Sequence, residues 1–171
     1  MPDTKFLVAK HLTIAVGLLS ATPFVAPSAP TVTEANALKN ISSAVRVNGY
    51  TFGLKASAQT PDRSFADDPA AQVRGFNAFG GDMPLYSPTN YADSTDILQQ
   101  IWTLVKAPGV GLWIMTRLGK INTTAFAAGD FVNVYQVLTD GFENQTAGII
   151  GGVSMITFLL PASRHFSIAL T

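Results

Sequence analysis

Few side chains in this sequence have the types and spacing that enzyme chemistry requires. Histidine occurs twice, at His11 and His165, and no Gly-x-Ser-x-Gly motif is present to supply a serine nucleophile. A catalytic triad needs a nucleophile, a base and an orienting acid in fixed geometry, so a lone histidine in a strand is more often structural. We predict that neither histidine is catalytic. A hydrolase built on His165 is the third hypothesis for function.

The carboxylates form three close pairs: Asp67 with Asp68, Asp93 with Asp96, and Asp140 with Glu143. A glycosidase needs two carboxylates that face each other across a cleft in unequal environments. Helix capping explains the second pair better, and a solvated polar loop explains the first. We therefore predict no catalytic residue and no enzyme activity.

Metal and cofactor sites are not predicted either. The chain has no cysteine, no His-x-x-x-His pair and no calcium-binding loop. Gly80-Gly81 and Gly151-Gly152 match neither a P-loop nor a dinucleotide fingerprint, and glycines beside strands are typical of bulges. Trp102 and Trp113 have aliphatic neighbours, which indicates core or interface positions.

Composition narrows the functional classes further. The 171 residues carry 11 Lys and Arg against 11 Asp and Glu, and 13% are charged while 47% are hydrophobic. Globular domains average about 25% charged residues. Tight binding to nucleic acid depends on many cations that displace counterions from phosphates, so the neutral balance argues against it. The length fits one domain with a core of its own.

Apolar periodicity predicts a mainly β fold, an antiparallel β-sandwich or open barrel with one flanking α-helix. Strand patterns cover 112–118, 131–138, 153–160 and 165–170, and the expected turns are Gly119-Lys120, Gly129-Asp130, Asp140-Gly141 and Pro161. Farther upstream, 73–79 and 83–86 read as strands around Gly80-Gly81. Alternation around Asn48-Gly49 indicates either a tight hairpin or one bulged strand.

One segment has a clear helical pattern. Asp93 or Ser94 is the expected N-cap, Lys106 suits the C-terminal end, and Pro108-Gly109 stops the helix. Six apolar residues at helical spacing are the candidates for packing between helix and sheet: Ile97, Leu98, Ile101, Trp102, Leu104 and Val105.

The first 39 residues lack sustained periodicity and contain four prolines. We predict an extended N-terminal arm at 1–39, with one strand near 6–16, and a single domain at 40–171. The same segment also imitates a secretory signal, because Lys5 and Lys10 precede an apolar stretch at 12–21 and Ala35-Asn36-Ala37 resembles a cleavage site. The second hypothesis for function is therefore a secreted β-sandwich binding or adhesion module.

The surface argument favours self-assembly. Residues 121–171 contain only four charges: Asp130, Asp140, Glu143 and Arg164. Open sheet edges are normally protected by charge or proline, so we expect other copies to cover them. The polar loop at 59–71 has Phe65 near its centre, which suggests docking. Heterologous contacts that close give a ring, and rings with complementary faces stack into a tube.

The order of these features resembles the major tail protein, or tail tube protein, of long-tailed bacteriophages, particularly those of actinobacterial hosts. The resemblance covers roughly 31–170. The residues that carry it are Ser64 to Asp68, Gly75, Phe79-Gly80-Gly81, the helix at 93–106, Met115 to Gly119, and Ala127 to Val132.

This resemblance implies a virion structural protein of the tail, assembled in the cytoplasm of the bacterial host as stacked hexameric rings. The rings would enclose the tape-measure protein, contact tail terminator and tip proteins, and later conduct DNA, with no cofactor and no membrane insertion. The N-terminal arm and the loop would join one ring to the next. The loop's contact candidates are Pro61, Asp62, Arg63, Phe65, Asp67 and Asp68.

Overall fold

A computed structural model describes residues 8–21, 24–48, 50–51, 53–54, 59–60, 73–74, 79–88, 90–145 and 153–171. Its elements, in chain order, are α1 (Val8–His11), β1 (Leu12–Leu18), α2 (Val32–Ala37), β2 (Lys39–Asn40), β3 (Gly53–Leu54), β4 (Gln59–Thr60), β5 (Val73–Arg74), β6 (Phe79–Tyr86), α3 (Ile97–Val105), β7 (Gly111–Leu118), β8 (Phe131–Gln145) and β9 (Val153–Ala169).

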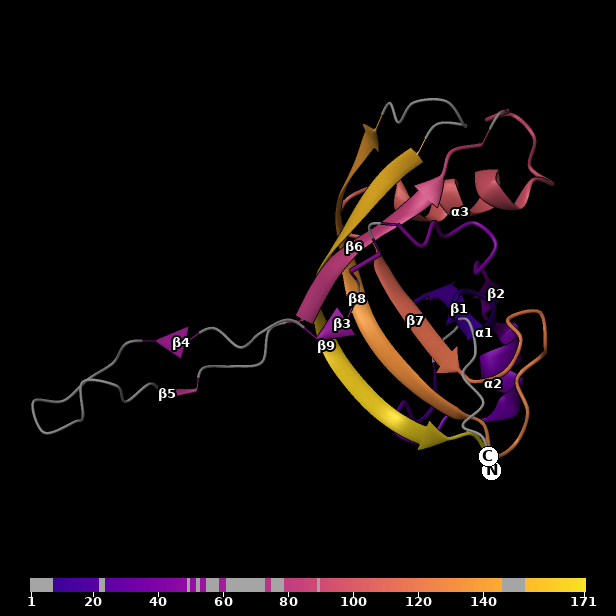
Figure 1. Ribbon diagram of the computed structural model, residues 1–171, viewed down its shortest axis with the longest axis vertical. Helices are drawn as coiled ribbons and strands as arrows, with labels where there is room; N and C mark the ends of the chain where they lie inside the picture. The colour runs from indigo at the N-terminus through magenta and orange to yellow at the C-terminus, as the bar shows by residue number, and fades with distance from the viewer. Residues whose placement is uncertain are drawn as a thin grey trace, which may run out of the picture.

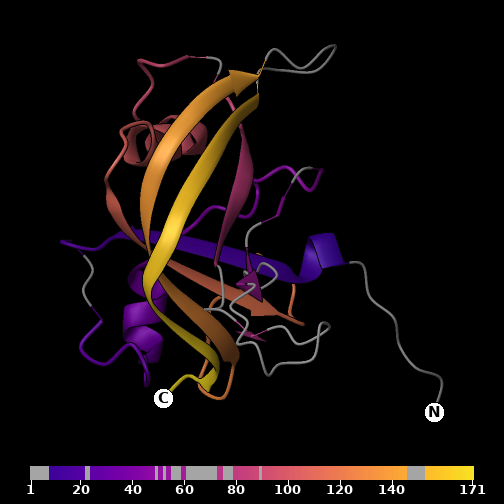
Figure 2. The ribbon, with the colours of Figure 1, turned by 90° about the vertical axis from the view of Figure 1, so that its left-hand side faces the viewer.

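The main feature is one antiparallel sheet of seven strands in the order β2-β1-β7-β8-β9-β6-β3, and a separate pair, β4-β5. The expected mainly β class with a flanking helix is confirmed. The long β8–β9 hairpin runs the height of the molecule, and β1 crosses it steeply (Figure 2). The sheet curls, and α3 lies beside its upper half (Figure 1).

The curl brings distant strands around one core. Ile14 of β1, Ile114 of β7 and Leu85 of β6 belong to the same buried cluster, together with Ile101 and Val105 of α3. Strands far apart in the sheet order can share a core only when the sheet bends toward closure. This arrangement corresponds to the open-barrel form of the expected architecture.

One short segment covers both edges of the sheet. At one edge, β2 pairs with β1 through Ala15 and Asn40. Four residues later the chain reaches the other edge, where the Tyr86 N–H donates to Ala44 O and the Arg46 N–H donates to Pro84 O, both at 2.9 Å. Residues 39–46 therefore bridge the mouth of the open barrel and satisfy edge groups that would otherwise pair with other chains.

A second core lies on the other face of β1 and β7. Ala15, Trp113 and Met115 are buried there with Ala35 of α2 and Phe126 of the β7–β8 connection. Strands that are covered on both faces read as continuous apolar runs instead of alternating ones. This burial accounts for the near-unbroken apolar sequence of β7.

Residues 12–18 and 32–37 differ from the expected extended arm. Leu12–Leu18 is a full strand of the main sheet, paired with β7 along its whole length. Val32–Ala37 is a helix that begins at a capping box between Thr31 and Glu34. Double-sided burial removes the period of two on which strand prediction depends, so β1 was placed too early and its integration was missed. The apolar stretch considered as a signal sequence contains this strand.

Several expected turns lie inside strands. β8 continues through Asp140 and Gly141 with a register shift there, and β9 continues through Pro161 where its register against β8 shifts between Gln136 and Leu138. Bulges accommodate glycine and proline within a strand. Gly141 and Pro161 therefore lie at irregularities of the strands and not at their ends. Gly80 and Gly81 likewise lie inside β6.

The described residues on both sides of Asn48-Gly49 lie against the same strand, because Val45 faces Leu85 and Gly53 pairs with Gly80 of β6. Residues 42–44 form turns, and Val45 makes an isolated bridge to Leu85. Hydrogen bonds of Ala44, Arg46 and Thr51 with β6 accompany this bridge, which fits the bulged-strand alternative better than the tight hairpin. Gly49 and most of 52–58 lie outside the described residues.

Candidate functional site

The described residues assemble no recognisable catalytic or metal centre. No group of three or more His, Asp or Glu side chains within those residues is placed to hold a metal ion. His11 Nδ1 lies 3.2 Å from the carbonyl oxygen of Gly119. His165 lies in β9 opposite Val134, and His11 is the last residue of α1.

The polar group with the most contacts is a buried ion pair that sequence reasoning missed. Arg117 of β7 and Asp130, which precedes β8, meet with Nη1 and Oδ2 2.8 Å apart, and their side chains are 1% and 4% exposed. A buried charge requires a partner and satisfied hydrogen bonds, because its desolvation is costly. The sequence does contain a signal for this ion pair. It is an arginine inside an apolar strand, followed by a Gly-Asp turn before the next strand.

The guanidinium of Arg117 also organises the connection between β7 and β8. It donates to the carbonyl oxygens of Thr124 at 2.7 Å and Ala125 at 2.9 Å, and to Thr13 Oγ1 of β1 at 3.0 Å. Its plane lies over the Phe126 ring, 4.8 Å from the centroid. One side chain thus fixes a loop of irregular backbone against two strands.

Asp130 is held as a carboxylate. Burial raises its pKa, but hydrogen bonds from Lys120, Arg117 and the Ala127 N–H outweigh that effect and keep the pKa below the ordinary value. Lys120 Nζ lies 2.5 Å from Oδ1, and its side chain is half exposed. Asp130 thus binds one buried cation, Arg117, and one half-exposed cation, Lys120.

The helix candidates lie in two different environments. Ile101 and Val105 are buried in the core shared with the sheet, and Ile97, Leu98 and Leu104 pack against it partly exposed. Trp102 instead meets the Tyr91 ring edge-on at 4.8 Å, and Lys106 Nζ lies 4.8 Å above the indole. Asp96 caps the helix by accepting from the Leu98 N–H at 3.0 Å, so the expectation of Asp93 or Ser94 was wrong by one short turn.

The candidate loop contacts lie outside the described residues: Pro61, Asp62, Arg63, Phe65, Asp67 and Asp68. What the structure describes are the strands at the two ends of this segment. β4 pairs with β5 through Gln59 with Arg74 and Thr60 with Val73. This pair lies well to the side of the main sheet (Figure 1).

The β8–β9 hairpin has strand edges that the rest of the described chain leaves uncovered. β7 pairs with β8 only as far as Leu138, while β8 continues to Gln145. On the opposite side, β6 pairs with β9 from Val153 to Phe158, while β9 continues to Ala169. Within the described ranges, the upper part of β8 and the lower part of β9 each have a strand on one side only.

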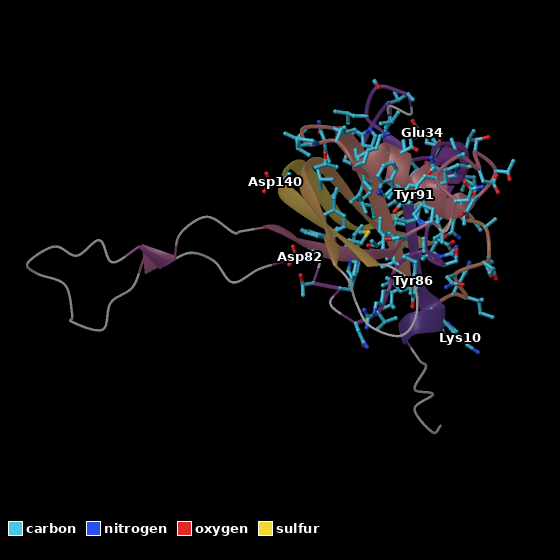
Figure 3. All side chains as sticks on the ribbon, turned by 90° about the horizontal axis from the view of Figure 1, so that it is seen from above. Lys10, Glu34, Asp82, Tyr86, Tyr91 and Asp140 are labelled. Carbon is cyan, nitrogen blue, oxygen red and sulfur yellow. The ribbon has the colours of Figure 1, made fainter. Side chains whose placement is uncertain are left out.

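Acidic side chains mark the face of the upper sheet that lies away from α3. Met83 and Leu85 of β6 are buried in the core with α3. Asp82 comes directly before Met83 in the same strand, so it belongs to the opposite face. Asp140 of β8 is exposed. Figure 3 shows both aspartates on the side of the sheet remote from α3.

In the part of the chain that the structure describes, no helix combines the length and apolarity needed to cross a membrane. The sequence model of the family described as phage tail tube protein matches residues 1–156. No curated protein matches the chain. The matched range includes β1, the Arg117–Asp130 pair and the acidic face.

Proposed function

The chain belongs to the phage tail tube protein family, and from this premise we propose that it self-assembles into stacked hexameric rings that conduct DNA. Family membership makes it a structural component of the virion tail. The observation that supports ring assembly is the pair of uncovered edges on the β8–β9 hairpin. We further propose that assembly takes place in the host cytoplasm.

The two edges have the geometry that a ring needs. One lies on the β7 side of β8 and the other on the β6 side of β9, so they face opposite ways in the same sheet. An edge on one copy and the opposite edge on the next make a heterologous contact, which closes into a ring when the rotation allows. Six such contacts would join six sheets into a continuous barrel without open edges.

The acidic face supports the role as a conduit. Asp82 and Asp140 lie on the face away from α3, and a barrel with the helices outside turns that face toward the lumen. Carboxylates repel phosphate, so DNA would pass without being held. The tape-measure protein would occupy the same channel before DNA, and terminator and tip proteins would cap its ends.

We propose that the polar loop at 59–71 joins one ring to the next. Its candidate residues follow β4 directly, and the β4–β5 pair forms its own two-stranded sheet. This pair lies well to the side of the main sheet, which supports a contact with another copy (Figure 1). The N-terminal residues outside the described range are a second candidate for this contact.

Electron microscopy of the purified full-length protein tests the proposal. We expect rings or tubes of uniform diameter at high protein concentration, with six-fold symmetry in end-on class averages. Light scattering provides the matching mass. A monodisperse monomer under all conditions of salt and concentration would contradict the proposed assembly.

A further inference from the structure

An exposed apolar patch lies where β1 begins, β7 ends and β8 begins. Leu118, Ile121 and Phe131 are 57%, 54% and 65% exposed. Leu118 pairs with Leu12 of β1, and Phe131 is beside Leu118 because both follow on from the pair Arg117 and Val132. We call these three residues the Leu118 patch. Apolar side chains that are exposed next to one another mark interaction surfaces.

Positive charge surrounds the Leu118 patch. Lys120 lies in the turn between Leu118 and Ile121, and its side chain is half exposed. The carbonyl oxygen of Lys10 accepts from the Asn122 N–H, so Lys10 borders the same turn, and its side chain points outward (Figure 3). Arg117 and Lys120 both bind the carboxylate of Asp130, and Lys10 adds a further cation beside the turn.

One segment of this chain has the complementary character. Residues 61–68 carry three aspartates and one arginine, with Phe65 near the middle. The flanking β4–β5 pair lies to one side of the sheet in Figure 1, whereas β7 ends on the other side. The described ends of this segment, β4 and β5, therefore lie away from the patch of their own copy.

We propose that residues 61–68 of a second copy dock on the Leu118 patch, with Phe65 against Leu118 and Phe131. The aspartates of the loop then lie beside Lys10 and Lys120. The inference rests on the proposed function, because stacked rings supply the second copy. Burial of an aromatic side chain provides the affinity, and the opposite charges set the orientation and speed the encounter.

Disulfide cross-linking between introduced cysteines tests the contact, because the natural chain contains no cysteine. Tubes of the Phe65→Cys, Leu118→Cys double variant should give a ladder of covalent multimers after mild oxidation. The matched control is Phe65→Cys with Val25→Cys, since Val25 is 93% exposed and lies in the segment before α2. We expect no ladder from the control.

The outcomes separate this inference from the proposed function. Rings and tubes without a ladder, or a cross-linked monomer whose loop reaches its own patch, would overturn the docking contact alone. Failure of the unmodified chain to form any ring would overturn the proposed function and the contact with it.

Charge reversal provides an independent measurement. Lys10→Glu with Lys120→Gln, which avoids a second carboxylate beside Asp130, should leave ring formation intact but reduce tube length at least several-fold in micrographs. Adding Asp67→Lys and Asp68→Lys should restore long tubes. Unchanged tubes in the first variant, or no restoration in the second while both remain folded by circular dichroism, would contradict the proposed charge pairing.

Discussion

At the scale of single residues, the informative group is the buried Arg117 and Asp130 pair. Such pairs add little net stability compared with a well-packed apolar replacement, but removal of one partner leaves an uncompensated buried charge. Here the arginine also satisfies the carbonyl oxygens of Thr124 and Ala125. The pair therefore specifies one conformation of the β7–β8 connection, which borders the Leu118 patch.

Arg117→Met should lower the free energy of unfolding by about 3 kcal/mol or more, because Asp130 and the loop carbonyl groups lose their donors. Urea denaturation followed by tryptophan fluorescence measures this loss. The matched control is Lys120→Met, which removes the half-exposed partner of the same carboxylate and should cost about 1 kcal/mol or less. Equal losses in the two variants would contradict the assigned role of Arg117.

Acid should weaken the fold through Asp130. Its pKa is lower in the folded protein than in the unfolded chain, so its stabilising contribution is complete above the unfolded pKa of about 4 and is lost as the pH falls through the folded pKa. Unfolding free energies measured from pH 7 to pH 2.5 should fall more steeply for the natural chain than for Asp130→Asn. The pKa values of Glu34 and Asp93 are also lowered. Because the natural chain and the Asp130→Asn variant both contain these two residues, they contribute equally to the two curves. Parallel curves would exclude a contribution from Asp130.

At the scale of elements, the sequence pattern predicted the helices and strands whose positions depend on neighbouring residues in the chain. The helix from Ile97 and the strand from Gly111 matched their patterns, because an apolar stripe and a bounded apolar run are visible in sequence. β1 was missed as part of the sheet because its partner β7 lies about 100 residues away and its second face is covered by α2. The partner and the cover are set by tertiary packing, which periodicity does not contain.

The candidate site shows the same difference between features set by local sequence and features set by tertiary packing. The helix residues that contact the core were identifiable from spacing, whereas the Arg117 and Asp130 pair joins two motifs that looked unrelated. Both residues belong to the stretches on which the family resemblance was based. Their mutual distance depends on β7 and β8 being neighbours in register, and this register was not available before the structure.

The cap of α3 gives a prediction at this scale. Asp96→Ala should lower the free energy of unfolding by about 1 kcal/mol, because the Leu98 N–H loses its acceptor and the helix dipole loses its negative charge. Ser94→Ala is the control and should change stability by less than about 0.5 kcal/mol. Chemical denaturation of both variants measures the difference. A larger loss for Ser94→Ala would mean that the helix begins earlier than the structure has it.

At the scale of the whole molecule, residues 39–46 cover parts of the sheet edge at β1 and at β6. This segment contacts β1 at one end of the sheet and β6 at the other. Among the described strands, the β8–β9 hairpin keeps two long uncovered edges, and the proposed ring contact forms there. The hairpin therefore presents two strand edges to a neighbouring copy, as the proposed ring contact requires.

The charge of the proposed lumen gives the last prediction. Asp140→Lys places six cations in each proposed hexameric ring on the face away from α3, where DNA would pass. Phages assembled with this variant should eject DNA several-fold more slowly at low salt, and high salt should restore the rate because it screens the attraction between lysine and phosphate. Asp140→Asn is the matched control, since it removes the carboxylate without adding a cation, and it should eject at nearly the natural rate. Fluorescence of a dye that binds released DNA measures the ejection in vitro. Equal rates for Asp140→Lys and Asp140→Asn at every salt concentration, in particles with normal tails, would mean that this face of the sheet does not line the channel.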